Sequence, residues 1–138
     1  EEVGLLGAKQ YVIDYEKQMA SHVIGAEWDY GTGNIYKMRT GVGHKALPAM
    51  KEFAAYLAPL GVELGDGNNA KAQSDMSLLS NAGMPSVNFS PDGTTYFDYH
   101  HTENDTLDKV DPDTLKQATT IYTMFAYFAA QSGVDFSH

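Results

Sequence analysis

The stretch NIYKMRTGVGHKALPAMKEFAAYLAPLGVEL, residues 34–64, decides the fold class. Its first part alternates apolar and polar residues well enough to predict a strand over 34–41. The middle part predicts a helix over 44–61, which has a proline near its start and a glycine at its end. One face of that helix carries Leu47, Met50, Phe53, Ala54 and Leu57. A short apolar segment at 62–64 predicts a second strand, so strand, helix and strand follow one another.

The rest of the chain continues this alternation of helices and short apolar strands. The remaining segments are predicted to be a helix over 4–20, a strand over 21–29, a polar loop over 65–73, a short helix ended by Gly83, a strand over 86–89, a loop over 92–106, and a helix from Asp111-Pro112 to Gly133. Such alternation is typical of an α/β domain in which helices cover a sheet. We therefore expect one domain over residues 1–138, built on a partial mixed sheet.

Composition excludes several classes of partner and site. The formal net charge of −9 argues against nucleic acid or an anionic membrane as partner, because both require a basic surface. No apolar run approaches the length of a membrane span. The chain has no cysteine, which excludes disulfides and thiolate metal sites. Any metal would have to be bound by histidine, aspartate or glutamate.

Three polar clusters are candidates for chemistry: the Glu1-Glu2 pair, the acids of 27–29 (EWD), and the loop 99–106 (YHHTENDT). Each also has a purely structural interpretation. Acids in a first helical turn interact favourably with the helix dipole. Acids after a strand are commonly solvated, and a histidine pair in a polar loop is commonly incidental. Taken singly, no cluster decides the function.

Together the clusters match what a two-metal hydrolase requires. A zinc site without thiolates uses imidazole and carboxylate ligands at about 2.0–2.2 Å. A pair of such ions lies about 3.5–4 Å apart, and a further carboxylate that is not on the metal takes the proton of the attacking water. Two adjacent glutamates could divide these tasks, because neighbouring side chains leave the backbone in different directions.

Four segments, EEVGLLGAKQY, EWDYGT, SDMSLL followed by AGMPSVNF, and YHHTENDTLDKVDP, resemble in this order the C-terminal half of the di-zinc exopeptidases of metallopeptidase family 28. The resemblance runs from Glu1 to about Leu115 and looks closest to the carboxypeptidase Q-like branch, with secreted bacterial aminopeptidases also in the family. It implies the C-terminal portion of a phosphorylase/hydrolase-like zinc exopeptidase domain. It also implies two zinc ions, a peptide substrate, and an extracellular or periplasmic location.

The resemblance assigns roles residue by residue. Glu1 matches the general base, Glu2 a ligand of one zinc, and Asp29 a ligand of the other. His101 matches the second ligand on the zinc of Glu2, with His100 as the alternative if the register differs by one. Asp105 either orients the histidine or caps the next turn, and the segment containing Ser74-Asp75 lies near the substrate pocket without an assigned catalytic role.

The family also requires a His-x-Asp motif and a bridging aspartate before the glutamate pair, which this chain lacks. None of its remaining histidines, His22, His44 and His138, begins such a motif. We therefore expect a fragment of the catalytic domain that is inactive or nearly so by itself, and that can self-associate through an exposed sheet edge. A non-catalytic interaction domain of the same fold and an unrelated α/β binding domain are the alternatives.

Overall fold

A computed structural model describes residues 2–138 and contains one mixed three-stranded sheet in the order β2-β1-β3. The central strand β1 (Ile35–Gly41) runs parallel to β2 (Glu63–Leu64) and antiparallel to β3 (Ser86–Pro91). The three strands match those predicted over 34–41, 62–64 and 86–89 to within two residues at each end. The predicted α/β class with a partial mixed sheet is therefore confirmed.

The central strand β1 contains a bulge that sets which of its side chains face the core. Ile35 pairs with Pro91 and Lys37 with Ser90, so Tyr36 is an extra residue on β1. Because of this extra residue, Ile35 and Met38 are both fully buried although they are three positions apart. Strict alternation would have placed one of them on the opposite face.

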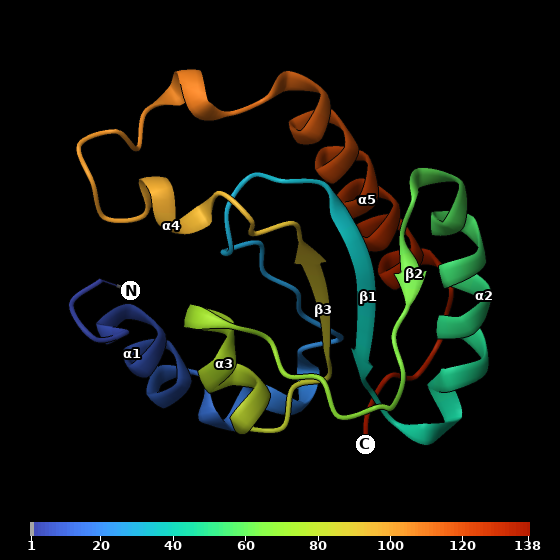
Figure 1. Ribbon diagram of the computed structural model, residues 1–138. Coiled ribbons are helices and arrows are strands. Elements are labelled where there is room, and N and C mark those ends of the chain that lie inside the picture. Colours follow the sequence, from blue (N-terminus) through green and yellow to red (C-terminus); the bar gives the residue numbers. More distant parts are fainter. Residues whose placement is uncertain (1) are drawn as a thin grey trace.

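Two long helices cover one face of the sheet and enclose the main core (Figure 1). These are α2 (Leu47–Leu57), flanked by the 3₁₀ turns η2 (His44–Ala46) and η3 (Ala58–Leu60), and α5 (Pro112–Gln131). Helix α5 begins as its sequence predicts, since the Asp111 carboxylate accepts hydrogen bonds from the backbone N–H groups of Asp113 and Thr114. The largest core side chains are Ile35, Met38, Met50, Phe53, Leu57, Phe89, Ile121, Phe125 and Phe136.

The N-terminal helix is shorter than predicted. Instead of one helix over 4–20, the chain forms α1 (Leu6–Asp14) and then a 3₁₀ helix, η1 (Glu16–Ser21), because the backbone leaves helical geometry at Tyr15. Among the apolar residues at three-to-four spacing that predict this helix, Ala8 and Met19 are buried, whereas Tyr11 and Tyr15 are exposed. Helix α1 packs against α3 (Ser74–Asn81) on the β3 side of the sheet (Figure 1). A small second core is formed by Met19, Leu79 and Met84 with Val12 and Met76.

The strand predicted over 21–29 is wrong. This segment makes only one parallel bridge, from Gly25 to Ser86, through the hydrogen bonds from Gly25 N to Pro85 O and from Val87 N to Gly25 O. A strand requires a ladder of successive backbone pairs, and the segment touches the edge of β3 at a single register. Its residues are extended all the same, and they lead from η1 to the loop in front of β1.

The predicted loop over 92–106 contains a short helix, α4 (Tyr96–Tyr99), and is followed by the 3₁₀ turn η4 (Leu107–Lys109). Figure 1 shows α4 and the connection to α5 passing beyond the end of β3. The loop before β1 leads into the same end of the sheet. Both loops that carry predicted site residues are therefore positioned by the central strands.

Candidate active site

Glu2 and His101 are brought into direct contact although 98 positions separate them in the chain. The Nε2 atom of His101 lies 2.9 Å from Oε2 of Glu2. Both side chains are open to solvent, with exposed fractions of 61% and 64% respectively. A metal ion could therefore reach the pair without a rearrangement of the fold.

Asp29, the third predicted ligand, lines the same cavity as this pair. The cavity has a volume of about 310 Å³, and the titratable side chains along it are those of Glu2, Asp29, Tyr96, Tyr99, His100, His101, Asp105 and Lys109. Glu2, Asp29 and His101 thus share one concave surface formed by the N-terminal segment, the loop before β1 and the loop after α4. Glu1, the predicted general base, lies outside the described residues.

His100 and His101 occupy different environments, although their rings are adjacent. The two imidazoles stack with a centroid distance of 3.8 Å, and His100 is half-buried between His101 and Tyr96. The contact with Glu2 is made by His101, whose backbone has a left-handed φ of 55°. Loop geometry supports this arrangement, because the Thr102 hydroxyl donates to Tyr99 O and accepts from Asn104 N.

The chemistry and spacing of this pair fit one zinc ion. Two ligands of a tetrahedral zinc at bond lengths of about 2.0–2.1 Å are separated by roughly 3.3 Å. The Nε2–Oε2 contact of 2.9 Å would need to lengthen by only about 0.4 Å to admit the ion. Within residues 2–138, no group of three or more His, Asp or Glu side chains is already arranged around a single point.

Glu27 has a positioning role that the sequence did not reveal. Its Oε2 atom accepts a hydrogen bond of 3.0 Å from the backbone N–H of Met76, in the first turn of α3. Partial burial raises the pKa of the Glu27 carboxyl, and the nearby carboxylates of Asp29 and Asp75 raise it further. The bond attaches the Asp29 loop to the start of α3. Only the occurrence of an acid two residues before Asp29 could have indicated it.

Two polar groups next to the loop are buried without a hydrogen-bond partner among the described residues. They are the indole N–H of Trp28 and the hydroxyl of Tyr122, whose rings stack at 6.4 Å. Burial raises the pKa of Tyr122, so its hydroxyl is protonated at neutral pH. The pair packs the Asp29 loop against α5.

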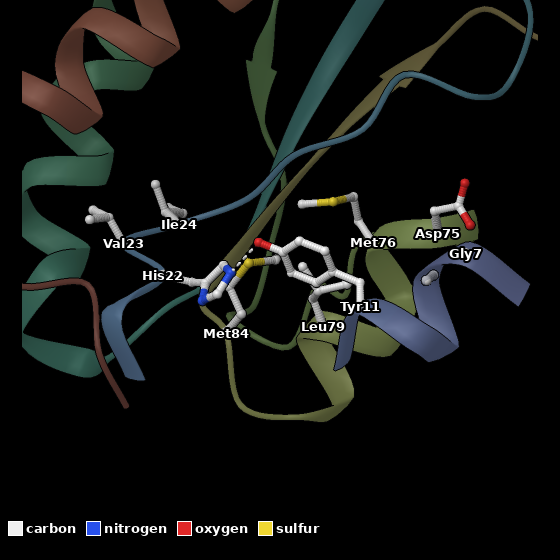
Figure 2. Close-up of a pocket in the computed structure, with 10 residues that line it drawn as sticks. Gly7, Tyr11, His22, Val23, Ile24, Asp75, Met76, Leu79 and Met84 are labelled. Carbon is white, nitrogen blue, oxygen red and sulfur yellow. Dashed lines mark hydrogen bonds between the residues drawn. The ribbon is translucent and has the colours of Figure 1, made fainter. Parts of the chain in front are cut away.

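The other histidines lie elsewhere. His22 lines a separate, mostly apolar cavity of about 430 Å³. Figure 2 shows this cavity between α1, α3 and the segment 22–24. The Nε2 atom of His22 is 2.9 Å from the Tyr11 hydroxyl and its Nδ1 atom is 3.1 Å from Gln18 O, so both ring nitrogens have partners. His44 is exposed at the start of η2, as its glycine-rich surroundings predict.

The sequence matches a known family of peptidases over most of its length. The model of peptidase family M28 matches residues 1–126. This chain belongs to peptidase family M28. Among curated relatives, the M28 chain is 29% identical over 130 residues to carboxypeptidase Q of Mus musculus and 27% identical over 132 residues to that of Homo sapiens. In both cases the match covers 94% of this chain and 27% of the relative.

A solved structure of the same family shares the fold. The M28 chain superposes with a TM-score of 0.90 and 41% identity on a peptidase M28 precursor from Shewanella amazonensis SB2B. The match covers 98% of this chain and 30% of that protein. The family prediction made from the four motifs is confirmed. The chain spans about a quarter of the length of the curated relatives it matches.

None of the helices formed within residues 2–138 has the length and apolar character needed to cross a bilayer.

Proposed function

We propose that this chain forms part of a zinc-dependent exopeptidase that hydrolyses peptide bonds with two zinc ions and a glutamate base. The observation that carries the proposal is the contact of 2.9 Å between Glu2 and His101, with Asp29 on the same cavity. The M28 match supports peptide hydrolysis, and the relatives named carboxypeptidase Q favour removal of a C-terminal residue over aminopeptidase action. The location proposed for the whole protein is extracellular or periplasmic.

In this proposal Glu2 and His101 hold one zinc and Asp29 contributes to the other. When bound, zinc supplies Lewis-acid polarisation of the substrate carbonyl and lowers the pKa of the attacking water. Glu1 accepts the proton of that water and returns it to the leaving amine. The half-buried loop residues Glu27 and Trp28 hold Asp29 in place.

The chain by itself should be a poor catalyst. The three proposed ligands are divided between two ions, whereas a catalytic zinc has three protein ligands and a water. The remaining ligands would come from a longer polypeptide of the length that the relatives have. We therefore propose that these 138 residues bind zinc weakly and contribute to turnover only within such a longer protein.

The test compares hydrolysis of unblocked dipeptides and of aminoacyl arylamides by this chain and by a longer M28 polypeptide that contains it. Glu1→Gln in the longer protein should abolish turnover while zinc content is retained. Glu2→Gln and His101→Ala should lower zinc content, and His100→Ala should lower it much less. Full activity in the Glu1→Gln variant would contradict the assignment of the base, and a longer protein without zinc would favour a non-catalytic interaction domain.

A further inference from the structure

Four aromatic rings form a continuous stack that joins the two loops of the site, and we name it the aromatic ladder: Tyr30, Tyr96, His100 and His101. The ring centroids are 4.3 Å apart between Tyr30 and Tyr96, 4.5 Å between Tyr96 and His100, and 3.8 Å between His100 and His101. The interplanar angles are 19°, 26° and 26°, so all three contacts are face to face. Stacking of aromatic rings is a favourable contact.

Two glycines provide the space for the first two rings of the aromatic ladder. A Cβ atom on Gly93 would lie 2.5 Å from the Cε1 atom of Tyr30. A Cβ atom on Gly31 would lie 3.3 Å from the Tyr96 ring, and Gly31 also has a left-handed φ of 79°. Because glycine has no side chain, the backbone at Gly31 and Gly93 leaves room for these two rings.

Each end of the aromatic ladder adjoins a proposed zinc ligand. Tyr30 directly follows Asp29 in the chain, and His101 at the other end contacts Glu2. The ladder therefore connects the ligand proposed for one zinc with the ligand pair proposed for the other. His101 has a left-handed φ of 55°, which non-glycine residues adopt rarely, so its position depends on the contacts around it.

We propose that Tyr96 is a positioning residue of the metal site. It holds the His100-His101 segment at a fixed orientation relative to the Asp29 loop, so that the His101 imidazole faces Glu2. This inference rests on the proposed function, since it assigns a role toward the zinc of Glu2 and His101. Groups that orient a metal ligand typically change metal affinity about 10–100-fold when they are removed.

The test uses the 138-residue chain with three variants: Tyr96→Ala, Tyr96→Phe and, as matched control, Phe97→Ala. Phe97 is the next residue of α4, is 72% exposed, and meets the ladder rings only edge to face. One readout is the zinc dissociation constant from competition with a chromogenic chelator. The other is the proton NMR shift of the His100 and His101 rings without metal, where ring currents from stacked neighbours report the ladder.

Tyr96→Ala is expected to weaken zinc binding roughly tenfold or more and to shift both histidine rings toward their free positions. Tyr96→Phe, which keeps a stacked ring, and Phe97→Ala should each stay within roughly threefold of the unaltered chain. If Tyr96→Phe loses as much affinity as Tyr96→Ala, the hydroxyl and not the stack is responsible, and the proposal is wrong.

Two further outcomes separate this inference from the proposed function. Unchanged zinc affinity in Tyr96→Ala, with the histidine shifts altered, would show a ladder that does not position the ligand and would overturn the inference alone. No zinc binding by the unaltered chain, with the ladder shifts present, would overturn the metal site and the role of Tyr96 with it.

Discussion

Gln117 of α5 connects three elements through its side-chain amide, and its replacement by leucine should be strongly destabilising. Its Oε1 atom accepts from Ile35 N at 2.8 Å, and its Nε2 atom donates to Ile35 O at 3.0 Å and to Leu60 O at 2.8 Å. These three partly buried bonds anchor the start of β1, just after the Asp29 loop, to α5 and to the turn before β2.

The magnitude follows from the count of these bonds. A typical intramolecular hydrogen bond contributes about 1 kcal/mol net, so Gln117→Leu should lower the free energy of unfolding by about 3 kcal/mol. Domains have total stabilities of about 5–15 kcal/mol, so this is a large fraction. For a chain of this length it corresponds to a melting temperature lower by roughly 10 °C.

The assay is urea unfolding followed by far-UV circular dichroism, with the free-energy change taken from the midpoint at constant slope. Lys116→Leu is the matched control, since Lys116 is the preceding residue of α5 and is exposed. It should change the free energy of unfolding by no more than about 0.5 kcal/mol. A loss below about 1 kcal/mol in Gln117→Leu would refute the reasoning, because it would mean that water replaces the amide without cost.

Other parts of the fold give three further predictions. The side-chain amide of Asn68 pairs with the backbone of Val42, directly after β1: its Oδ1 atom accepts from Val42 N at 3.1 Å and its Nδ2 atom donates to Val42 O at 2.6 Å. Asn68→Ala should therefore lower the free energy of unfolding in urea by about 2 kcal/mol. The control is Asn69→Ala, at an exposed neighbouring residue, which should lower the free energy of unfolding far less. Equal losses in the two variants would contradict the role of the Asn68 amide. A hydrogen bond from Lys109 and one from Thr106 lower the pKa of Asp108 to about 2. Lys109→Met should therefore raise that pKa toward 3.8 in a carboxyl NMR titration, and no upward change would exclude the pairing. The stabilisation from this carboxylate is present above pH 3.8 and disappears as the pH falls through about 2. Gly43→Ala would place a Cβ atom 1.7 Å from Ser137 O, so hydrogen exchange at the Gly43–Phe136 contact should accelerate; unchanged protection would contradict this.

Much of the fold was predictable because local patterns and tertiary packing agree there. Helix α2 buries four of the five residues predicted for its apolar face, Met50, Phe53, Ala54 and Leu57, while Leu47 is half-buried. On α5, three-to-four spacing predicts an apolar face that includes Leu115, Ala118 and Phe125. Ala118 and Phe125 are buried, but Leu115 is 44% exposed, and Ile121, which is not part of that series, is buried. Spacing identifies a face of a helix, whereas the neighbouring elements decide which edge of that face is covered.

The errors occur where partners at long range decide the outcome. Residues 21–29 are apolar enough for a strand, but only Gly25 pairs with β3. Composition cannot show how many successive residues of a segment will pair with a neighbouring strand. The apolar stripe of 4–20 predicts one helix, yet Tyr11 and Tyr15 stack on each other at the surface, with exposed fractions of 39% and 40%. Amphipathic spacing alone does not show that a face will be covered.

The candidate site was found through its motifs and not through its physical pattern. Glu2, Asp29 and His101 lie in three separate polar segments, whose residue types indicated a two-metal site and whose individual roles came from resemblance to the M28 family. The structure then places them on one cavity. The aromatic ladder and the bond from Glu27 to α3 could not be predicted, because ring stacking and helix capping depend on loop conformations that sequence spacing does not define.

The most direct test of the central claim is a zinc titration of the ¹⁵N-labelled chain, followed through the ring nitrogens of its histidines. If Glu2 and His101 share one zinc, the Nε2 resonance of His101 should show the large change expected on metal coordination, and Glu2→Gln should weaken this response. His22 and His44 should not respond in the same concentration range. A response of His22 or His44 at equal zinc concentration, or a His101 response that Glu2→Gln leaves unchanged, would contradict the account.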